Sequence, residues 1–163
     1  MLTKAYLSLG SNLGDRAAHL REAIRKLSDA GTVTNCSSFY QTEPVEVTNQ
    51  PDFLNCAVEL ETKLSPHQIL EAILKIELAM GRDRSTQPPK GPRTIDIDLL
   101  LAGDAVINSP HLVVPHPAMQ GRRFVLEPLA EIAPDTIHPL LHRTIQELRD
   151  EMPAGQGVRT VFE

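Results

Sequence analysis

The sequence predicts an α+β fold in which helices pack on a mainly antiparallel β-sheet. Two observations support this class. Segments of strand and helix periodicity follow one another through residue 101 in the order strand, helix, strand, strand, helix, strand. The chain also has 163 residues, 41% of them hydrophobic, which is enough for one domain with a sizeable core. This order, in which two of the four strands follow each other directly, is typical of a ferredoxin-like αβ sandwich. We therefore expect a single domain over residues 1–163.

The first strand is expected over residues 4–9, where side chains alternate between the two faces. The segment GSNLGD that follows, residues 10–15, is a turn in which Asn12 or Asp15 caps the next helix. That helix carries apolar residues at helical spacing and is expected to stop at Gly31.

Two more strands, over residues 32–42 and 53–61, come next. The second helix begins after Ser65, a natural N-cap followed by proline, and ends at Gly81. A polar loop rich in Arg and Pro then leads into a strand with the sequence GPRTIDIDLLL, residues 91–101. Beyond it we expect two short helices and an edge strand, at residues 125–134, 144–152 and 158–162.

Charge and hydropathy narrow the range of partners. The net charge of -5 argues against binding to nucleic acids or anionic membranes, because both are polyanions. No window approaches a membrane span, and the first apolar run is too short for a signal peptide, so we expect a cytoplasmic protein, which we take to be a monomer. Cys36 and Cys56 lack a CxxC or His-rich context and are expected to be reduced core thiols.

The strand at residues 91–101 contains two acids that a buried strand does not need. Strand side chains alternate, so Asp96 and Asp98 share one face, and the apolar residues Ile95, Ile97, Leu99 and Leu101 share the other. At roughly 7 Å and an effective dielectric of about 20, the two carboxylates repel by on the order of 2 kcal/mol. Removing either one should therefore relieve repulsion, and some ligand or cation must offset it in the protein.

The second helix has a matching anomaly. Its apolar face is formed by residues at helical spacing, and Glu77 falls in the middle of that face. A carboxylate held near a core must find hydrogen bonds, a cation or a ligand, because burying it alone costs at least several kcal/mol.

Basic residues lie between these acids in the sequence: Arg82, Arg84, Lys90 and Arg93. One interpretation is a structural cluster in which Arg82 and Arg93 pair with the two aspartates. The other is that the aspartates bind divalent cations and the arginines bind the anion that the cations carry. Two Mg²⁺ ions about 3.5 to 4 Å apart can share carboxylates at this spacing, and the substrate would then be a polyphosphate.

Seven segments give the chain a resemblance to one family. They are GSNLGD, SSFYQTEPV, QPDFLNCAV, IELAMGR, GPRTIDIDLLL, VPHPAM and RRFVLEPLAEIAP, in the same order along nearly the whole chain. In these segments the sequence resembles the 6-hydroxymethyl-7,8-dihydropterin pyrophosphokinases of the folate pathway. The resemblance implies one pyrophosphokinase domain that binds ATP, Mg²⁺ and a pterin alcohol.

The resemblance also implies roles for individual residues. Asp96 and Asp98 correspond to the ligands of two Mg²⁺ ions, and Arg82 and Arg93 to the residues that stabilise the transferring group. The positions that match the pterin site are Thr42, Val45, Phe53, Asn55 and Phe124. The positions that match the ATP site are Glu77, Arg84, Lys90, Leu99, Val113, His116 and Arg122, where Leu99 and Val113 would offer backbone groups to adenine. Lys90 stands where some family members have tryptophan.

The expected reaction is attack of the pterin hydroxymethyl oxygen on the β-phosphorus of ATP, with AMP as the leaving group. Two alternatives stay open. A two-metal nucleotidyltransferase would release pyrophosphate in place of AMP. A non-catalytic ferredoxin-like binding module would use the acids and arginines only for structure, although the acidic charge and 4% aromatic content do not favour its RNA-binding form.

Overall fold

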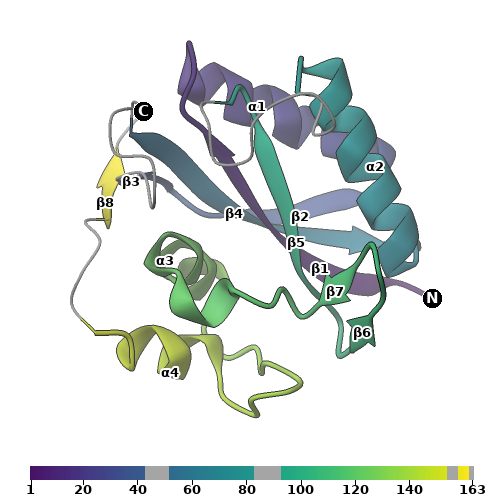
Figure 1. Cartoon of the computed structure of the whole chain (residues 1–163), viewed down its shortest axis with the longest axis vertical. Coiled ribbons are helices and arrows are strands. Elements are labelled where there is room, and N and C mark those ends of the chain that lie inside the picture. Colours follow the sequence, from purple (N-terminus) through teal and green to yellow (C-terminus); the bar gives the residue numbers. More distant parts are fainter. Residues whose placement is uncertain (43–51, 83–92, 154–157, 162–163) are drawn as a thin grey trace.

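The computed structural model describes residues 1–42, 52–82, 93–153 and 158–161. Within them, six strands form one antiparallel sheet with helices on both faces (Figure 1). One pair of helices, α1 (Arg16–Lys26) and α2 (Pro66–Ala79), covers one face, and the other pair, α3 (Arg123–Ile132) and α4 (Ile145–Asp150), lies on the opposite side. The α+β class is thus confirmed. The predicted site residues Val45, Arg84 and Lys90 lie outside the described residues.

The sheet has the strand order β5-β1-β4-β3-β8, and β2 also pairs with β4. Each pairing is antiparallel, so β1 runs parallel to β2 and β3 with β4 inserted between them. This arrangement is the split β-α-β topology of a ferredoxin-like sandwich, as predicted. The strands are β1 (Thr3–Ser11), β2 (Thr32–Cys36), β3 (Phe39–Thr42), β4 (Phe53–Thr62), β5 (Asp96–Ala102) and β8 (Val158–Val161), and β6 (Ile107–Asn108) forms a separate hairpin with β7 (Val113–Val114).

Two hydrophobic cores lie on the two faces of the sheet. The first fills the space under α1 and α2 and includes Leu7, Leu9, Leu20, Val58, Leu60, Ile73, Ile97 and Leu99. The second lies under α3 and α4 and includes Tyr6, Ala57, Leu101, Leu126, Leu129 and Ile145. The sheet is therefore buried on both sides over much of its length, and the exceptions on the second face form the candidate site.

The predicted strand over residues 32–42 is two strands in the structure. β2 pairs Cys36 with Val58, whereas β3 pairs Tyr40 with Asn55, so one extra residue is inserted on this side. At the break, Ser37 donates its N–H to Ala57 O at 2.9 Å and accepts the Ala57 N–H with its hydroxyl at 2.8 Å. A side-chain acceptor thus replaces the backbone carbonyl, a pairing that periodicity does not reveal.

β5 begins at Asp96, and its alternation is interrupted further along. The register with β1 shifts because Tyr6 pairs with Leu101 and Leu7 pairs with Leu99, which leaves Leu100 as a bulge. Leu101 consequently joins the second core, and the prediction that it shares a face with Ile97 and Leu99 is wrong. The aspartates precede the bulge and keep the predicted common face.

The helix ends follow partly from the sequence. Ser65 caps α2 through a capping box with Gln68, and Gly81 ends this segment with a φ of 89°, as predicted. Of the two candidates for the α1 N-cap, Asp15 is the cap and accepts the Ala18 N–H at 3.1 Å. The first helix does not run to Gly31, because α1 gives way to a 3-10 turn, η1 (Leu27–Asp29).

Gly31 lies beyond the end of the helix that was predicted to stop there, and it has a packing role. A Cβ atom at this position would lie 2.4 Å from the backbone oxygen of Glu61 in β4. We expect Gly31→Ala to lower the free energy of unfolding by about 1–3 kcal/mol, because the strand or the turn must shift. Urea denaturation measures the change. Gly121→Ala is the matched control, since nothing lies within 4 Å of its added methyl group, and equal stability of the two variants would contradict the packing role.

The segment between α3 and α4 contains a buried histidine, His138, which is 3% exposed. Its Nδ1 accepts the backbone N–H groups of Leu140 and Leu141, each at 3.2 Å. Burial lowers the pKa of His138 from its ordinary 6.5, and nearby His142 lowers it further, against a backbone hydrogen bond that raises it. The His138 imidazole therefore binds a proton less readily in the native state than in the unfolded chain.

A depressed histidine pKa gives stability that is present above pH 6.5 and is lost as the pH falls through the folded-state value. We expect the free energy of unfolding to fall more steeply between pH 7.5 and 5.5 in the wild type than in His138→Gln. Urea unfolding at several pH values tests this. His111→Gln, at an exposed loop position, is the control, and parallel curves for the wild type and His138→Gln would refute the assignment.

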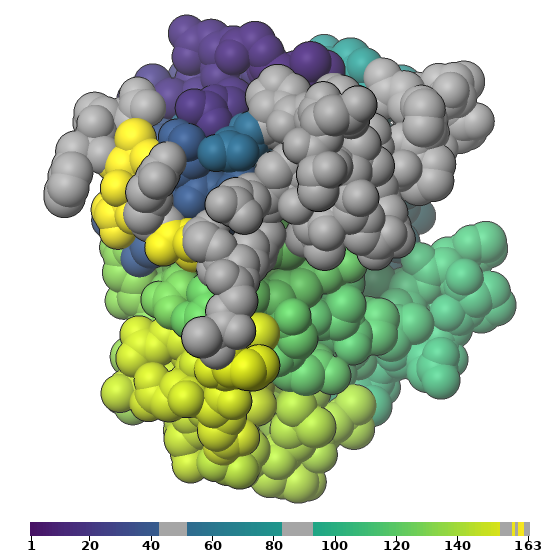
Figure 2. All heavy atoms as spheres, turned by 60° about the vertical axis from the view of Figure 1, so that its left-hand side comes forward, coloured from purple at the N-terminus to yellow at the C-terminus, as the bar shows by residue number. Residues whose placement is uncertain are grey.

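Among the described strands, β8 pairs with β3 alone and forms the edge of the sheet, as predicted for this segment. Figure 2 shows its yellow atoms at the surface beside the blue atoms of the β3 and β4 region, above the green of α3.

The sequence predicts that no segment spans a membrane, and the helices of the structure bear on this prediction. Among the described residues, no helix combines the length and the hydropathy required to cross a bilayer.

Candidate active site

The two aspartates of β5 project from the sheet face that carries α3. Asp96 pairs across the sheet with Gly10 of β1, and Asp98 pairs with Ser8. Small neighbours leave both carboxylates partly exposed, and Asp96 exposes 23% of its side chain. The acids therefore stand side by side on one face of a rigid edge strand, as the alternation predicts.

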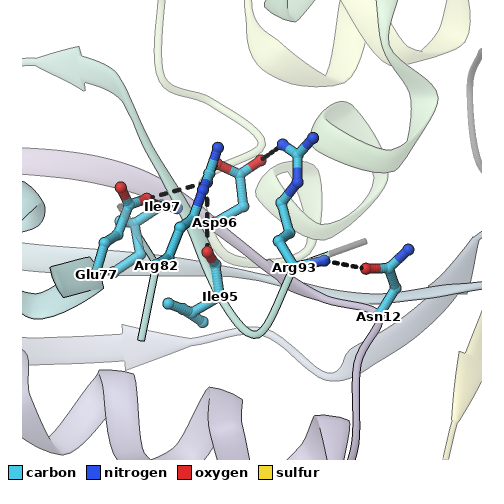
Figure 3. A network of polar contacts seen from close by, with 7 residues as sticks. All are labelled: Asn12, Glu77, Arg82, Arg93, Ile95, Asp96 and Ile97. Carbon is cyan, nitrogen blue, oxygen red and sulfur yellow. Dashed lines mark hydrogen bonds and ion pairs between the residues drawn. The ribbon is translucent and has the colours of Figure 1, made fainter. Parts of the chain in front are cut away.

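Arg82 lies just beyond the end of α2 and joins three acceptors through its Nη1 atom (Figure 3). It forms an ion pair with Asp96 Oδ1, and it lies 3.4 Å from Glu77 Oε2 and 3.3 Å from the backbone oxygen of Ile95. Only 9% of this arginine is exposed. A buried guanidinium is thus held beside Asp96 by groups of the protein itself.

Glu77 explains how α2 tolerates an acid on its apolar face. The side chain is 1% exposed, and Oε2 accepts the backbone N–H of Ile97 at 2.7 Å. Within the part of the chain that the structure describes, β5 pairs only with β1, so its outer edge has no neighbouring strand there to accept this N–H. The Glu77 carboxylate takes that place and pairs with Arg82 as well, which meets the requirement predicted for a buried acid.

Arg93 reaches the other oxygen of the same aspartate. Its Nη1 lies 3.2 Å from Asp96 Oδ2, and its guanidinium lies 5.9 Å from the centre of the Phe53 ring. Two residues that are 11 apart in the sequence, Arg82 and Arg93, therefore meet at Asp96. The prediction that these arginines lie near the acids is confirmed for Asp96, and the position of the Phe53 ring near Arg93 adds Phe53 to the same group.

The described candidates for the pterin site come from two parts of the fold, the strands β3 and β4 and the helix α3. Asn55 and Thr42 are buried on β4 and β3, and the Asn55 amide donates to the Thr42 hydroxyl at 2.6 Å. Gly10 is required next to them, because an added Cβ would lie 2.6 Å from Asn55 Oδ1. Phe53 lies beside this pair on β4, whereas Phe124 comes from α3 and has the Arg122 guanidinium 5.6 Å from its ring centre.

Most of the described candidates for the ATP site lie on β5 or contact it. Leu99 is a core residue of β5. Val113 belongs to β7, which contacts β5. His116 donates its backbone N–H to Leu100 O at 3.0 Å, and its ring accepts the Ala118 N–H at 3.2 Å. Arg122 comes from a different element, as the N-cap residue of α3. β5 therefore connects the other candidates, but not Arg122, to the acids.

Sequence reasoning did not identify Glu131 of α3. Its carboxylate accepts the Ser38 N–H at 2.9 Å, the Ser38 hydroxyl at 3.1 Å and the Tyr40 hydroxyl at 2.6 Å. Burial and the neighbouring carboxylate both raise the pKa of Tyr40. These bonds tie α3 to β3, so they connect the helix that carries Phe124 to the strand that carries Thr42. The available signal was the presence of Glu131 and Ser38 in two of the seven matching segments.

Taken together, an α+β sandwich carries an edge strand with paired, partly exposed carboxylates and with arginines already beside them. Carboxylates suit hard cations, and arginines suit phosphate oxygens. These features define a protein of the class that acts on phosphorylated substrates.

A family model described as 7,8-dihydro-6-hydroxymethylpterin-pyrophosphokinase (HPPK) matches residues 6–134, and the chain belongs to this family. A 2-amino-4-hydroxy-6-hydroxymethyldihydropteridine pyrophosphokinase of Bacillus subtilis is 49% identical over 130 residues, which are 78% of this chain and 77% of that protein. One of the same description from Aquifex aeolicus is 39% identical over 150 residues, 92% of each chain. The resemblance drawn from the seven segments, and with it the expected enzyme class, is confirmed at the level of the family.

Some relatives are much longer than this chain. The folic acid synthesis protein fol1 of Schizosaccharomyces pombe is 42% identical over 157 residues. The matched region covers 95% of this chain but only 21% of that protein. Among solved structures, an HPPK-DHPS of Plasmodium falciparum aligns with a TM-score of 0.75 at 20% identity, over 93% of this chain and 44% of that one. This likeness supports the fold.

Proposed function

We propose that this chain transfers the diphosphate group of ATP to the hydroxymethyl oxygen of 6-hydroxymethyl-7,8-dihydropterin, a step of folate synthesis that yields AMP and the pterin diphosphate. The observation that carries the proposal is the meeting of the carboxylate of Asp96 with Arg82 and Arg93, beside the ring of Phe53. This arrangement offers charge for a polyphosphate and an aromatic surface for a flat ring at one place.

Asp96 and Asp98 are the proposed ligands of two Mg²⁺ ions. The donor set fits, because Mg²⁺ commonly takes one or two protein carboxylates and fills its other positions with water and phosphate oxygens. When bound, the ions neutralise part of the triphosphate charge and orient its oxygens. Asp96 is paired with Arg82 and Arg93 in the structure, so these arginines become available to phosphate oxygens once the carboxylate has a cation.

The two arginines are proposed to stabilise the charge that develops on the transferring group. Reactions of this kind depend on positioning and electrostatics more than on covalent help from the protein. Arg82 suits this role because Glu77 and the Ile95 carbonyl hold its guanidinium in place. Little reorganisation is then needed when the substrates bind.

The pterin is proposed to lie between Phe53 and Phe124, with its polar edge at Asn55. Aromatic rings favour stacking with a flat heterocycle, and an amide both donates to and accepts from such an edge. Thr42 supports this geometry because its hydroxyl accepts a hydrogen bond from the Asn55 amide nitrogen and so fixes the orientation of the amide. Val45 is proposed to complete the pocket.

The adenine is proposed to bind at the outer edge of β5. The Ile97 N–H points outward to Glu77, so the backbone of Leu99, two residues along, faces the same edge. We propose that Leu99 and Val113 offer backbone groups there and that basic and polar side chains bind the rest of the nucleotide: Arg84, Lys90, His116 and Arg122. The 1% exposure of Glu77 favours an indirect contribution, through Ile97 and Arg82.

The product mixture from ATP, Mg²⁺ and the reduced pterin alcohol tests the proposal. We expect AMP and the pterin diphosphate in equal amounts, which phosphorus NMR resolves. Pyrophosphate as the second product would favour the two-metal nucleotidyltransferase. Binding of both compounds without turnover would favour the non-catalytic module.

Kinetics of an arginine variant test the proposed division of roles. We expect Arg93→Ala to lower kcat by about 10²–10³-fold, because an interaction with developing charge is lost. KM for the pterin should change much less, since the ring is bound by Phe53, Asn55 and Phe124. A variant with normal kcat and a raised pterin KM would contradict the role of Arg93 in the chemical step.

We also propose that residues 1–163 act as one domain and as a cytoplasmic monomer. The pairing of β8 with β3 supports a single domain, because it joins the C-terminal segment to the sheet that β1 begins. Sedimentation equilibrium of the purified chain tests the monomer, and a dimer mass would refute it.

A further inference from the structure

Asn12 is held against Arg93 by two hydrogen bonds, and the role of helix cap that the sequence offered for Asn12 does not account for this contact. We propose that Asn12 is a positioning residue for Arg93, so that the rate of diphosphate transfer depends on the Asn12 side chain through that arginine. The inference rests on the proposed function and adds a residue to it.

The contact is reciprocal. The backbone N–H of Asn12 donates to Arg93 O at 3.1 Å, and Asn12 Oδ1 accepts the Arg93 N–H at 2.8 Å (Figure 3). The two residues thus exchange bonds as partners in an antiparallel ladder do, except that a side-chain oxygen replaces one carbonyl. Asn12 is 1% exposed, so water does not readily substitute for this bond.

The bond matters because of where Arg93 lies. β5 begins at Asp96, so the strand ladder does not hold the backbone of Arg93, three residues earlier. Asn12 follows the last residue of β1, the central neighbour of β5, and is therefore anchored to the sheet. The two hydrogen bonds of Asn12 therefore fix the Arg93 backbone relative to the sheet.

The guanidinium of Arg93 is the group that benefits. It lies 3.2 Å from Asp96 and 5.9 Å from the centre of the Phe53 ring, at the point where the two proposed substrates meet. A small rotation of the Arg93 backbone is amplified along its long side chain. A misplacement of about 1 Å at such a group can cost about 10²-fold in rate.

The competing role for Asn12 is that of a local turn or helix residue. Asp15 already caps α1 through its bond to the Ala18 N–H, so the cap position does not need Asn12. A purely structural role would lower stability and leave the contribution of Arg93 to the rate intact. The two roles therefore differ in how Asn12 and Arg93 variants combine.

A double-mutant cycle on the full chain separates them. We expect Asn12→Ala to lower kcat by about 10- to 100-fold, with the pterin KM changed by less than about threefold. In an Arg93→Ala background, the same substitution should lower kcat by less than about twofold, because there is no guanidinium left to misplace. Equal factors in the two backgrounds would overturn the proposal.

Two further variants and one measurement keep the result interpretable. Asn12→Asp keeps an acceptor for the Arg93 N–H, and we expect its kcat to exceed that of Asn12→Ala. Ser11→Ala alters a buried neighbour that contacts His19 instead, and we expect the same small factor in both backgrounds. Hydrogen exchange of the Arg93 amide should be faster in Asn12→Ala than in the wild type, and unchanged exchange would refute the bond.

A wild-type chain without transfer activity would contradict the proposed function. An active wild type whose double-mutant cycle is additive would contradict only this inference.

Discussion

Asp98→Ala is expected to lower kcat by about 10³-fold or more while the protein stays folded. The proposed metal ions meet the chain at this carboxylate and at Asp96, so the substitution removes one of the two proposed ligands and the charge stabilisation that depends on it. Steady-state kinetics at saturating Mg²⁺ measure the loss, and urea denaturation measures folding. A kcat near that of the wild type would contradict the metal proposal.

The same substitution at Asp96 should separate activity from stability. On the sequence alone, removing either acid relieves repulsion and preserves or improves folding. The structure changes this expectation for Asp96, because its removal leaves the buried Arg82 without its closest carboxylate. We expect Asp96→Ala to lose activity and also stability, because Arg82 loses this partner. Asp104→Ala is the control for a lost negative charge, at an exposed turn beyond β5.

Glu77→Ala is expected to give the largest loss of stability, about 3 kcal/mol or more. The change leaves the outward N–H of Ile97 without its acceptor and removes one of the two carboxylates that pair with Arg82. Removing one partner of a buried ion pair typically costs about 3–5 kcal/mol, and the remaining Asp96 offsets part of this. For a chain of this size, the melting temperature should fall by about 6–12 °C.

Two variants on α2 show whether the loss has this cause. Glu77→Gln keeps an oxygen for the Ile97 N–H and should be less destabilising than Glu77→Ala. Glu71→Ala removes an exposed carboxylate from the same helix and should change stability by no more than about 0.5 kcal/mol. If Glu77→Ala and Glu71→Ala were equally stable, the bonds of Glu77 to β5 and Arg82 would not contribute to folding.

Much of the fold was predictable because local sequence determines local structure. The capping box at Ser65, the left-handed Gly81 and the alternation around Asp96 and Asp98 each depend on a few neighbouring residues. The element order then restricts the topology, since short connections leave few ways to arrange two helices and four strands. The errors occurred where a strand departs from regular pairing, at Ser37 and at Leu100, because a bulge is a property of two strands together.

The chemical identity of the site was also visible in the sequence. A carboxylate pair in a strand and an acid on an apolar helix face are costly wherever the chain folds, so each requires a partner. The basic residues supplied the candidates for those partners, and the seven family segments supplied the class of reaction. Sequence alone could not choose between a structural cluster and a substrate site, because both use the same residues.

Tertiary structure decided which of these groups meet. Arg82 joins Glu77 to Asp96, the Glu77 carboxylate replaces a missing strand at Ile97, and Asn12 holds Arg93 from the end of β1. These contacts connect residues from three elements that are adjacent only after the sheet has formed. Periodicity reports which face a side chain occupies, but a hydrogen bond requires its donor and acceptor to lie within about 3 Å, and only the packed register of strands and helices brings distant residues that close.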